Sequence, residues 1–328
     1  MTYNLKDNIA YRILESRMSH KFISDIEQIE TDITPILNEI SIYFNNYTLH
    51  DINHSLRVLY NMCAIAGNDT LKDMSDLELA MIIYVALLHD VGMWISSDEI
   101  IQIENSPPFD YYLRKNNRNK TLALQDYIRP IHGKRSYEYL MSDKKIIRLL
   151  SDRDLSTVSF AEDVALICQS HMESIRWIDE KLKENFAKKY CYNSKYIALL
   201  LRLADYIDFD SQRAPQYLLE HKHLGNFSYM EWKKHAVVCN QDKVDEERKE
   251  IFFDIECDDF NLYCKLIDTL DLMSKEIHDS VSYSKHFAKP IYHLRINDKT
   301  RINIVTKGFK PEKFSFTLDY YKHHFTSF

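Results

Sequence analysis

Apolar residues recur at helical spacing along most of the first two thirds of the chain. Ile26, Ile29 and Ile33, for example, follow one another at steps of three or four residues, which places their side chains on one face of a helix. The same pattern predicts helices over the ranges 5–22, 23–44, 51–66, 76–90, 132–150, 160–173 and 195–208. It weakens between residues 96 and 129, where a Pro-Pro pair and an Asn- and Lys-rich stretch predict an exposed loop or lid.

After about residue 225 the spacing changes. Residues 236–240 and 250–257 have the composition of strands, and a long helix is predicted over 259–287. Three later segments alternate apolar and polar residues as half-buried strands do, over 290–296, 301–306 and 313–319. Asn297–Thr300 predicts a hairpin turn between the first two. The expected fold class is therefore mainly α, with a helical bundle domain over 1–222 followed by a small α+β domain over 223–328.

Composition narrows the choice of fold and partner. Five glycines and seven prolines make 12 of 328 residues, or under 4 %, whereas these two residue types usually make up about 12 % of a protein. The sequence also contains no glycine-rich phosphate-binding loop. The net charge of −7 argues against broad binding to nucleic acid. The six cysteines form no C-x-x-C pair, which excludes zinc-ribbon and dithiol redox motifs. The longest uncharged apolar run, Leu79 to Leu88, is too short to span a membrane, so we expect a cytoplasmic protein with reduced thiols.

The candidate chemistry lies at the ends of apolar helices. His89 and Asp90 directly follow the apolar run, and His54 lies four residues after His50, a spacing that would place both on one helical face. Three further residues have similar apolar surroundings: His132, His171 and Asp205. Burial of such groups is costly unless they are hydrogen-bonded or bind a cation.

Each of these residues alone has an ordinary structural explanation. A single histidine on an apolar helix is usually a hydrogen-bonded core residue, and Asp205 has Arg202 as an alternative ion-pair partner. Six such residues together are harder to explain by packing. Imidazole nitrogens and carboxylate oxygens are ligands for zinc, iron, manganese, cobalt and nickel, so the set predicts a transition-metal site.

The order of these residues resembles the HD superfamily of metal-dependent phosphohydrolases. The four-ligand H…HD…D pattern of that superfamily is matched by His54, His89, Asp90 and Asp205. His132 and His171, which lie between the HD pair and the last aspartate, resemble the extended pattern of two-metal members, including the HD-GYP phosphodiesterases. The resemblance covers about residues 45–220 and implies an HD-type helical domain.

Within the superfamily, the chain is most similar to the HD-CE type, whose R-x-x-H-x-x-R-S pattern reads here Arg129-Pro-Ile-His132-Gly-Lys-Arg135-Ser136. Two positions depart from the HD-GYP enzymes. Met93 stands where those enzymes have a lysine, and the GYP signature is missing. Specificity for cyclic di-GMP is therefore not expected.

The resemblance also implies roles for the candidate residues. Two divalent ions are expected, the first bound by His54, His89, Asp90 and Asp205, and the second by His132 and His171 with Asp90 bridging. In the alternative, His132 and His171 hydrogen-bond the phosphate beside a single ion. Arg135 and Arg213 are candidates for binding substrate phosphate, unless they form structural ion pairs, and His50 is a candidate ligand or general acid. Asp208 and Glu173 are candidates for orienting imidazoles.

Two functions from different classes fit this sequence. The first is a metal-dependent phosphohydrolase that acts on a nucleotide or a nucleotide-derived messenger. The second is a nucleotide-binding sensor or scaffold that works with a partner, since domains of the HD-CE type are often associated with Hsp90-like ATPases; bacterial defence is a candidate role for it. The intact ligand set favours the enzyme.

Overall fold

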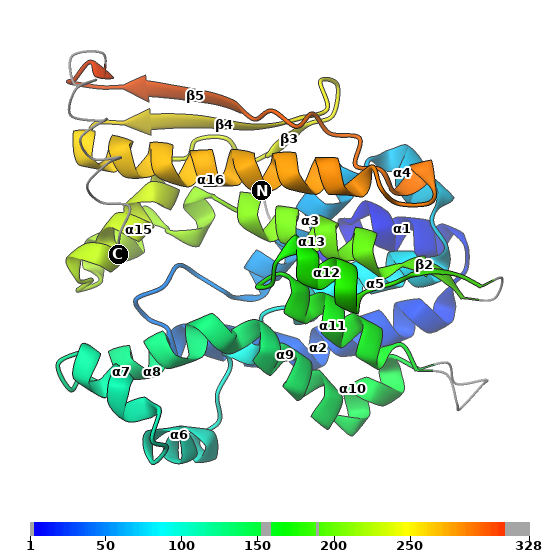
Figure 1. Ribbon diagram of the computed structural model, residues 1–328, viewed down its shortest axis with the longest axis horizontal. Coiled ribbons are helices and arrows are strands. Elements are labelled where there is room, and N and C mark those ends of the chain that lie inside the picture. The colour runs from blue at the N-terminus through cyan, green and yellow to red at the C-terminus, as the bar shows by residue number, and fades with distance from the viewer. Residues whose placement is uncertain (1–2, 152–158, 188–189, 312–328) are drawn as a thin grey trace. The chain divides into compact units, whose positions relative to one another are not determined.

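The computed structural model describes residues 3–151, 159–187 and 190–311, and the chain divides into two compact units. The first unit comprises Met1–Asn45, Leu49–Asp208 and Ser280–Arg295, and the second comprises Asn46–Thr48, Phe209–Asp279 and Ile296–Phe328. The mainly helical fold with a small α+β region is confirmed (Figure 1). The domain boundary after residue 222 stays a prediction.

The first unit is built almost entirely of helices. Its α-helices are α1 (Ile9–Ser16), α2 (His20–Tyr43), α3 (Ile52–Ala66), α4 (Asn68–Asp73), α5 (Asp76–Leu88), α6 (Ser97–Glu104), α7 (Phe109–Lys115), α8 (Lys120–Ile128), α9 (His132–Ser142), α10 (Lys144–Leu149), α11 (Ala161–Ser170), α12 (Ile175–Lys181) and α13 (Ser194–Ile207). The short strands β1 (Glu184–Phe186) and β2 (Cys191–Asn193) form an antiparallel pair.

Helix α5 is the centre of this unit. A capping box begins it, in which the Ser75 side chain accepts from the Glu78 backbone N–H and the Glu78 side chain accepts from that of Ser75. Every residue from Leu77 to Leu88 is buried, as expected for a helix that is apolar on all sides. Helices α1, α2, α3, α11 and α13 all contact it. The polar residues that follow α5 therefore enter the interior of the helical unit.

Most predicted helices are present, but two of the predicted ranges are divided by local backbone features. The range 132–150 is two helices, because the Asp143 side chain accepts from the backbone N–H groups of Lys145 and Ile146 and so caps a new helix. The first predicted helix, 5–22, is likewise interrupted after Ser16, where Met18 has a positive φ of 55°.

The expected loop over residues 96–129 was wrong, since α6, α7 and α8 lie there. The residues that suggested a loop instead separate short helices. Pro108 immediately precedes α7. Asn117 and Arg118 adopt positive φ values between α7 and α8, and Asn119 caps α8.

The second unit combines a small sheet with helices. Its elements include α14 (Gln216–His221), α15 (Asn226–Ala236), β3 (Val244–Asp245), β4 (Glu250–Cys257) and β5 (Arg301–Thr306). Strand β4 pairs antiparallel with β3 and parallel with β5. Helix α16 (Phe260–Ser284) connects β4 toward β5 and continues into the first unit. The side chains of β4 alternate between buried and partly exposed positions, so one face of the sheet forms core.

Two strand predictions in this region were correct and two were wrong. Strands β4 and β5 have the predicted bounds. Residues 236–240 end a helix and contribute only a single bridge, from Val238 to Ile255. Residues 290–296 form a short 3-10 turn (Pro290–Tyr292) followed by residues outside any strand, so Asn297–Thr300 is no hairpin turn. The predicted strand 313–319 lies outside the described residues.

The 290–296 segment alternates for another reason. The Tyr292 hydroxyl donates to Glu78 at 2.6 Å, and the Leu294 backbone N–H donates to Ser284 Oγ at 3.0 Å. Both side chains are buried. The alternation therefore reflects side chains that pack into the first unit from a 3-10 turn and the residues after it, and not from a strand.

Within the described ranges, no single helix is both long and apolar enough to cross a membrane, while one bent pair of segments, 76–93 with 97–104, meets the length and composition test.

Candidate metal centre

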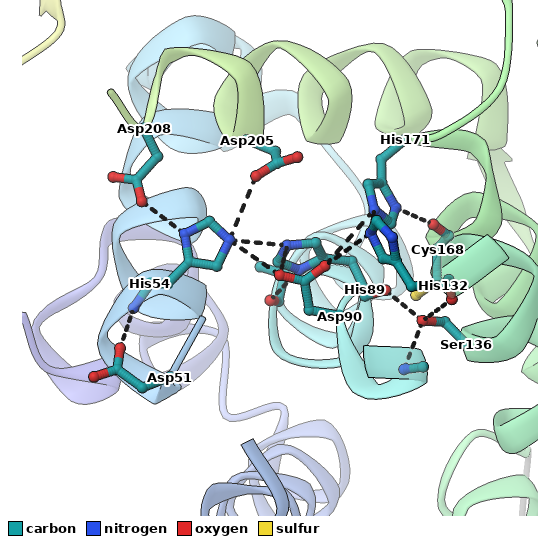
Figure 2. Close-up of polar contacts among 12 residues, drawn as sticks. Asp51, His54, His89, Asp90, His132, Ser136, Cys168, His171, Asp205 and Asp208 are labelled. Carbon is teal, nitrogen blue, oxygen red and sulfur yellow. Dashed lines mark hydrogen bonds and ion pairs between the residues drawn. The ribbon is translucent and has the colours of Figure 1, made fainter. Parts of the chain in front are cut away.

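The six predicted ligands come from five helices of the first unit, each at or near a helix end. Figure 2 shows them around a common centre. They are His54 in the first turn of α3, His89 at the C-terminus of α5, Asp90 directly after it, His132 at the start of α9, His171 at the C-terminus of α11, and Asp205 in the last turn of α13. The structure thus brings together all six residues.

One group of contacts forms around the Oδ2 atom of Asp90. His54 Nε2 lies 3.3 Å from this oxygen and His89 Nε2 lies 3.4 Å from it. The two ring nitrogens are themselves 3.3 Å apart. Asp205 Oδ1 approaches His54 Nε2 at 3.4 Å from the other side.

A second group forms around the other oxygen of the same carboxylate. His132 Nε2 lies 3.4 Å from Asp90 Oδ1, and His171 Nε2 lies 3.7 Å from it. The two ring nitrogens are 2.8 Å apart. Asp90 therefore presents one oxygen to each pair of imidazoles, and it is the residue shared by both groups (Figure 2).

The opposite nitrogen of every ring is held by an acceptor. His54 Nδ1 donates to Asp208 Oδ2 at 2.6 Å. In the other three rings Nδ1 donates to a backbone carbonyl three residues earlier, of Ala86, Arg129 and Cys168, at 3.0, 2.6 and 2.5 Å. A carbonyl oxygen can only accept, so Nδ1 carries the proton, and in the neutral ring Nε2 is then a bare lone pair.

This arrangement could hold a cation. Four Nε2 lone pairs and a carboxylate converge in a buried space, and two of those nitrogens lie 2.8 Å apart. Asp90 Oδ2 is buried and accepts no hydrogen bond from any residue that the structure describes. Two sets of ligand atoms each lie within 4.8 Å of one another, His54–His89–Asp90 and Asp90–His132–His171. Nitrogen-rich donors of this kind favour transition metals over magnesium or calcium.

Burial and the neighbouring charged groups together shift the pKa values of Asp90 and His171. Burial raises the pKa of Asp90, but the surrounding histidines outweigh burial and hold it well below its usual value. Burial, together with the neighbouring His132 and His89, lowers the pKa of His171 to about 3. The carboxylate is thus ionised and His171 is neutral at physiological pH, which are the protonation states that metal binding requires.

Asp208 and Arg57 hold His54 in place. Arg57 donates from Nε to Asp208 Oδ1 at 2.9 Å and from Nη2 to Oδ2 at 3.2 Å, and both side chains are buried. The expectation that Asp208 orients an imidazole agrees with these contacts. A carboxylate–histidine pair of this kind fixes the tautomer and orientation of a metal ligand.

The helix containing His54 begins later than the sequence suggested. Asp51 is its N-cap and accepts from the His54 backbone N–H at 3.0 Å, so His50 precedes the helix and does not share its face. The His50 ring nevertheless contacts the His54 ring edge-on, with centroids 5.4 Å apart. His50 therefore lies beside the cluster without being among its closest ligand atoms.

The two candidate phosphate-binding arginines have different surroundings. The Arg135 guanidinium forms an ion pair with Glu99 and donates to the backbone oxygens of Gly92 and Trp94 at 2.7 and 2.8 Å. These contacts count against a substrate role. Arg213 is buried in the second unit, in the 3-10 turn Ser211–Arg213, and its substrate role stays a prediction.

Several residues that support the cluster escaped the sequence analysis. Arg202 of α13 donates to the backbone oxygens of Ser170 and Glu173 at the C-terminus of α11, and so fixes the helix end that carries His171. Arg57 follows His54 by three residues on the same helix, which is a signal the sequence did contain. The backbone acceptors had no sequence signal.

Comparison with known proteins gives one family. The model of the HD-CE family matches residues 44–279. No curated protein and no solved structure matches the chain.

Proposed function

This chain belongs to the HD-CE family, and on that premise we propose that it is a metal-dependent phosphohydrolase. The proposed reaction cleaves a phosphoester or phosphoanhydride bond in a nucleotide or a nucleotide-derived messenger. The observation that carries the proposal is the position of Asp90, with one carboxylate oxygen facing each of two imidazole pairs.

The ligand assignment follows this geometry. We assign His54, His89, Asp90 and Asp205 to one divalent ion, and Asp90, His132 and His171 to a second. A divalent ion supplies a water nucleophile at neutral pH and neutralises charge on the phosphoryl oxygens. Asp90, His132 and His171 would give the second ion three protein ligands, and the remaining positions would be open to water and phosphate.

The chain's own residues have three tasks in this proposal. The Nδ1 acceptors hold all four Nε2 atoms toward the centre and make Nε2 the proton-free nitrogen of each neutral ring. Asp205 has a side chain that is 26 % exposed, against 4 % for Asp90, so substrate approaches from its side of the cluster. His50 lies beside His54, and we assign it the protonation of the leaving oxygen.

A nucleotide panel tests the proposal. The purified protein is stripped with chelator, reloaded with manganese, cobalt, nickel or magnesium, and incubated with mono-, di- and cyclic nucleotides, with products separated by chromatography. We expect turnover with a transition metal, its loss in chelator and in Asp90→Asn, and retention in Lys134→Ala, whose exposed side chain forms an ion pair with Glu138 on the helix surface.

The outcome also separates the two functions considered above. Hydrolysis that survives chelation would overturn metal dependence. If metal binds but no nucleotide in a broad panel is hydrolysed with any of the four ions, the enzyme proposal fails, and the sensor function with an ATPase partner becomes the better one.

A further inference from the structure

Two of the five glycines lie where a side chain would have no room. A Cβ atom added at Gly67, Gly225 or Gly308 would meet nothing within 4 Å. One added at Gly92 would lie 2.2 Å from the His132 backbone oxygen and 2.3 Å from the Ser136 backbone nitrogen. The turn after Asp90 (Val91–Met93) therefore touches the first turn of α9 backbone to backbone.

The second such glycine lies on the other side of the same helix. A Cβ at Gly133 would lie 2.9 Å from the Gln169 backbone oxygen and 3.0 Å from Met172, so α9 also packs closely against the end of α11. Gly92 follows Asp90 by two residues, and Gly133 directly follows His132. Both close approaches thus lie beside residues of the second ligand group.

Two side chains of α9 form hydrogen bonds across the contact between α9 and the Val91–Met93 turn. Ser136 is fully buried, and its hydroxyl accepts from the Gly92 backbone N–H at 2.9 Å and donates to the His89 backbone oxygen at 2.5 Å. Arg135 donates to the backbone oxygens of Gly92 and Trp94. Figure 2 shows the Ser136 side chain with its hydrogen bonds to neighbouring atoms.

The Arg135 contacts continue to a neighbouring helix. Its two terminal nitrogens face the carboxylate of Glu99 in α6 while Nε donates to Gly92. A planar guanidinium can satisfy acceptors on three sides at once, whereas a lysine ammonium on a flexible stem cannot reproduce that fork. Every Arg135 donor in these contacts binds a protein atom, either a backbone oxygen of Gly92 or Trp94 or the carboxylate of Glu99.

We propose that Arg135 and Ser136 are positioning residues that assemble the second half of the metal centre. They hold α9, and with it His132, at the correct distance from Asp90, and the inference rests on the proposed two-ion centre. The rings of the first half have other supports, because His54 Nδ1 donates to Asp208 and His89 Nδ1 donates to the Ala86 backbone oxygen. Ser136 contacts His89 through the backbone oxygen and not through the ring.

The test is stepwise metal binding to the full chain. Manganese affinity and stoichiometry are measured by calorimetry for the wild type, Ser136→Ala and Arg135→Lys, with Lys134→Ala on the same helix as the matched control. Electron paramagnetic resonance reports whether the two ions are exchange-coupled. We expect the second ion to bind about 10- to 100-fold more weakly in both variants, with loss of the coupled signal, while the first ion binds as in the wild type.

Each result has a distinct meaning. Unchanged affinity for both ions, or equal weakening of both together with a lower melting temperature, would overturn the positioning role. A wild type that binds no metal would instead refute the proposed function. If a variant fails to fold, Glu99→Gln removes the charge partner of Arg135 at a partly exposed position and is expected to weaken the second ion alone, and its failure to do so would also overturn the inference.

Discussion

Replacing Asp90 by asparagine should remove both metal ions while leaving the fold intact. The amide has nearly the same shape as the carboxylate but no charge, and it offers one oxygen where the carboxylate offers two. In the structure each oxygen serves a different imidazole pair, Oδ2 facing His54 and His89 and Oδ1 facing His132 and His171. One substitution therefore acts on both halves of the centre.

The size of the effect follows from binding linkage. An ion present at 100 times its dissociation constant stabilises the folded state by about 2.7 kcal/mol, so two independent ions contribute about 5.4 kcal/mol. At about 2–4 °C per kcal/mol for a domain of this size class, metal should raise the wild-type melting temperature by about 10–20 °C. His171→Gln leaves the first ligand group intact and should retain about half of that rise, and Asp90→Asn should retain almost none.

Thermal unfolding followed by circular dichroism measures these shifts. Each protein is melted after chelation and again at the metal concentration that saturates the wild type, and activity is followed in parallel. The chelated Asp90→Asn protein should have the helical signal of the chelated wild type. A full metal-dependent rise in Asp90→Asn would refute the shared-ligand geometry. Complete loss of the rise in His171→Gln would refute the division into two halves.

Three further predictions concern neighbouring groups. Asp208→Asn removes the partner of the buried Arg57 and should lower the free energy of unfolding by about 3–5 kcal/mol, measured with urea; a loss below about 1 kcal/mol would contradict the buried pair. Arg213→Ala should raise KM or lower kcat by the equivalent of about 1.5–3 kcal/mol without loss of metal, and unchanged kinetics would give it a purely structural role. Burial lowers the pKa of His132, but the neighbouring carboxylate outweighs burial and raises it. Protonated His132 must lose its Nε2 proton to bind metal, so metal affinity should fall as pH falls through this pKa. Calorimetry in buffers of different ionisation enthalpy should detect the released protons, and their absence would contradict a raised pKa at His132.

The candidate ligands could be predicted from sequence because their residue types are rare in apolar surroundings. His89 and Asp90 follow ten consecutive uncharged apolar residues, and such a position requires polar partners. What fixes each ring was beyond the sequence, because three of the four Nδ1 acceptors are backbone carbonyls. Every residue has a carbonyl, so only the folded chain shows which ones face a histidine.

The fold was predictable where periodicity and burial coincide. The range 250–257 was predicted as a strand and is one, since its alternating side chains pack on one face of a sheet. The range 290–296 alternates as well, and Leu294 is buried there. Its backbone N–H, however, donates to the Ser284 hydroxyl and not to a neighbouring strand. Alternation of apolar and polar residues therefore indicates which side chains are buried, but it does not identify the hydrogen-bond partner of the backbone. Arg135 shows the same limit, because its motif could be found but its acceptors, Gly92 and Trp94, could not.

Anomalous diffraction from crystals grown with manganese tests the two-ion centre most directly. Two ions predict two anomalous peaks about 3.5–4 Å apart, one beside His54 and His89 and the other beside His132 and His171, with Asp90 between them. A single peak would contradict the two-ion centre if His132 Nε2 and His171 Nε2 were each more than about 3 Å from it, since imidazole nitrogens bind such metals at about 2.0–2.2 Å.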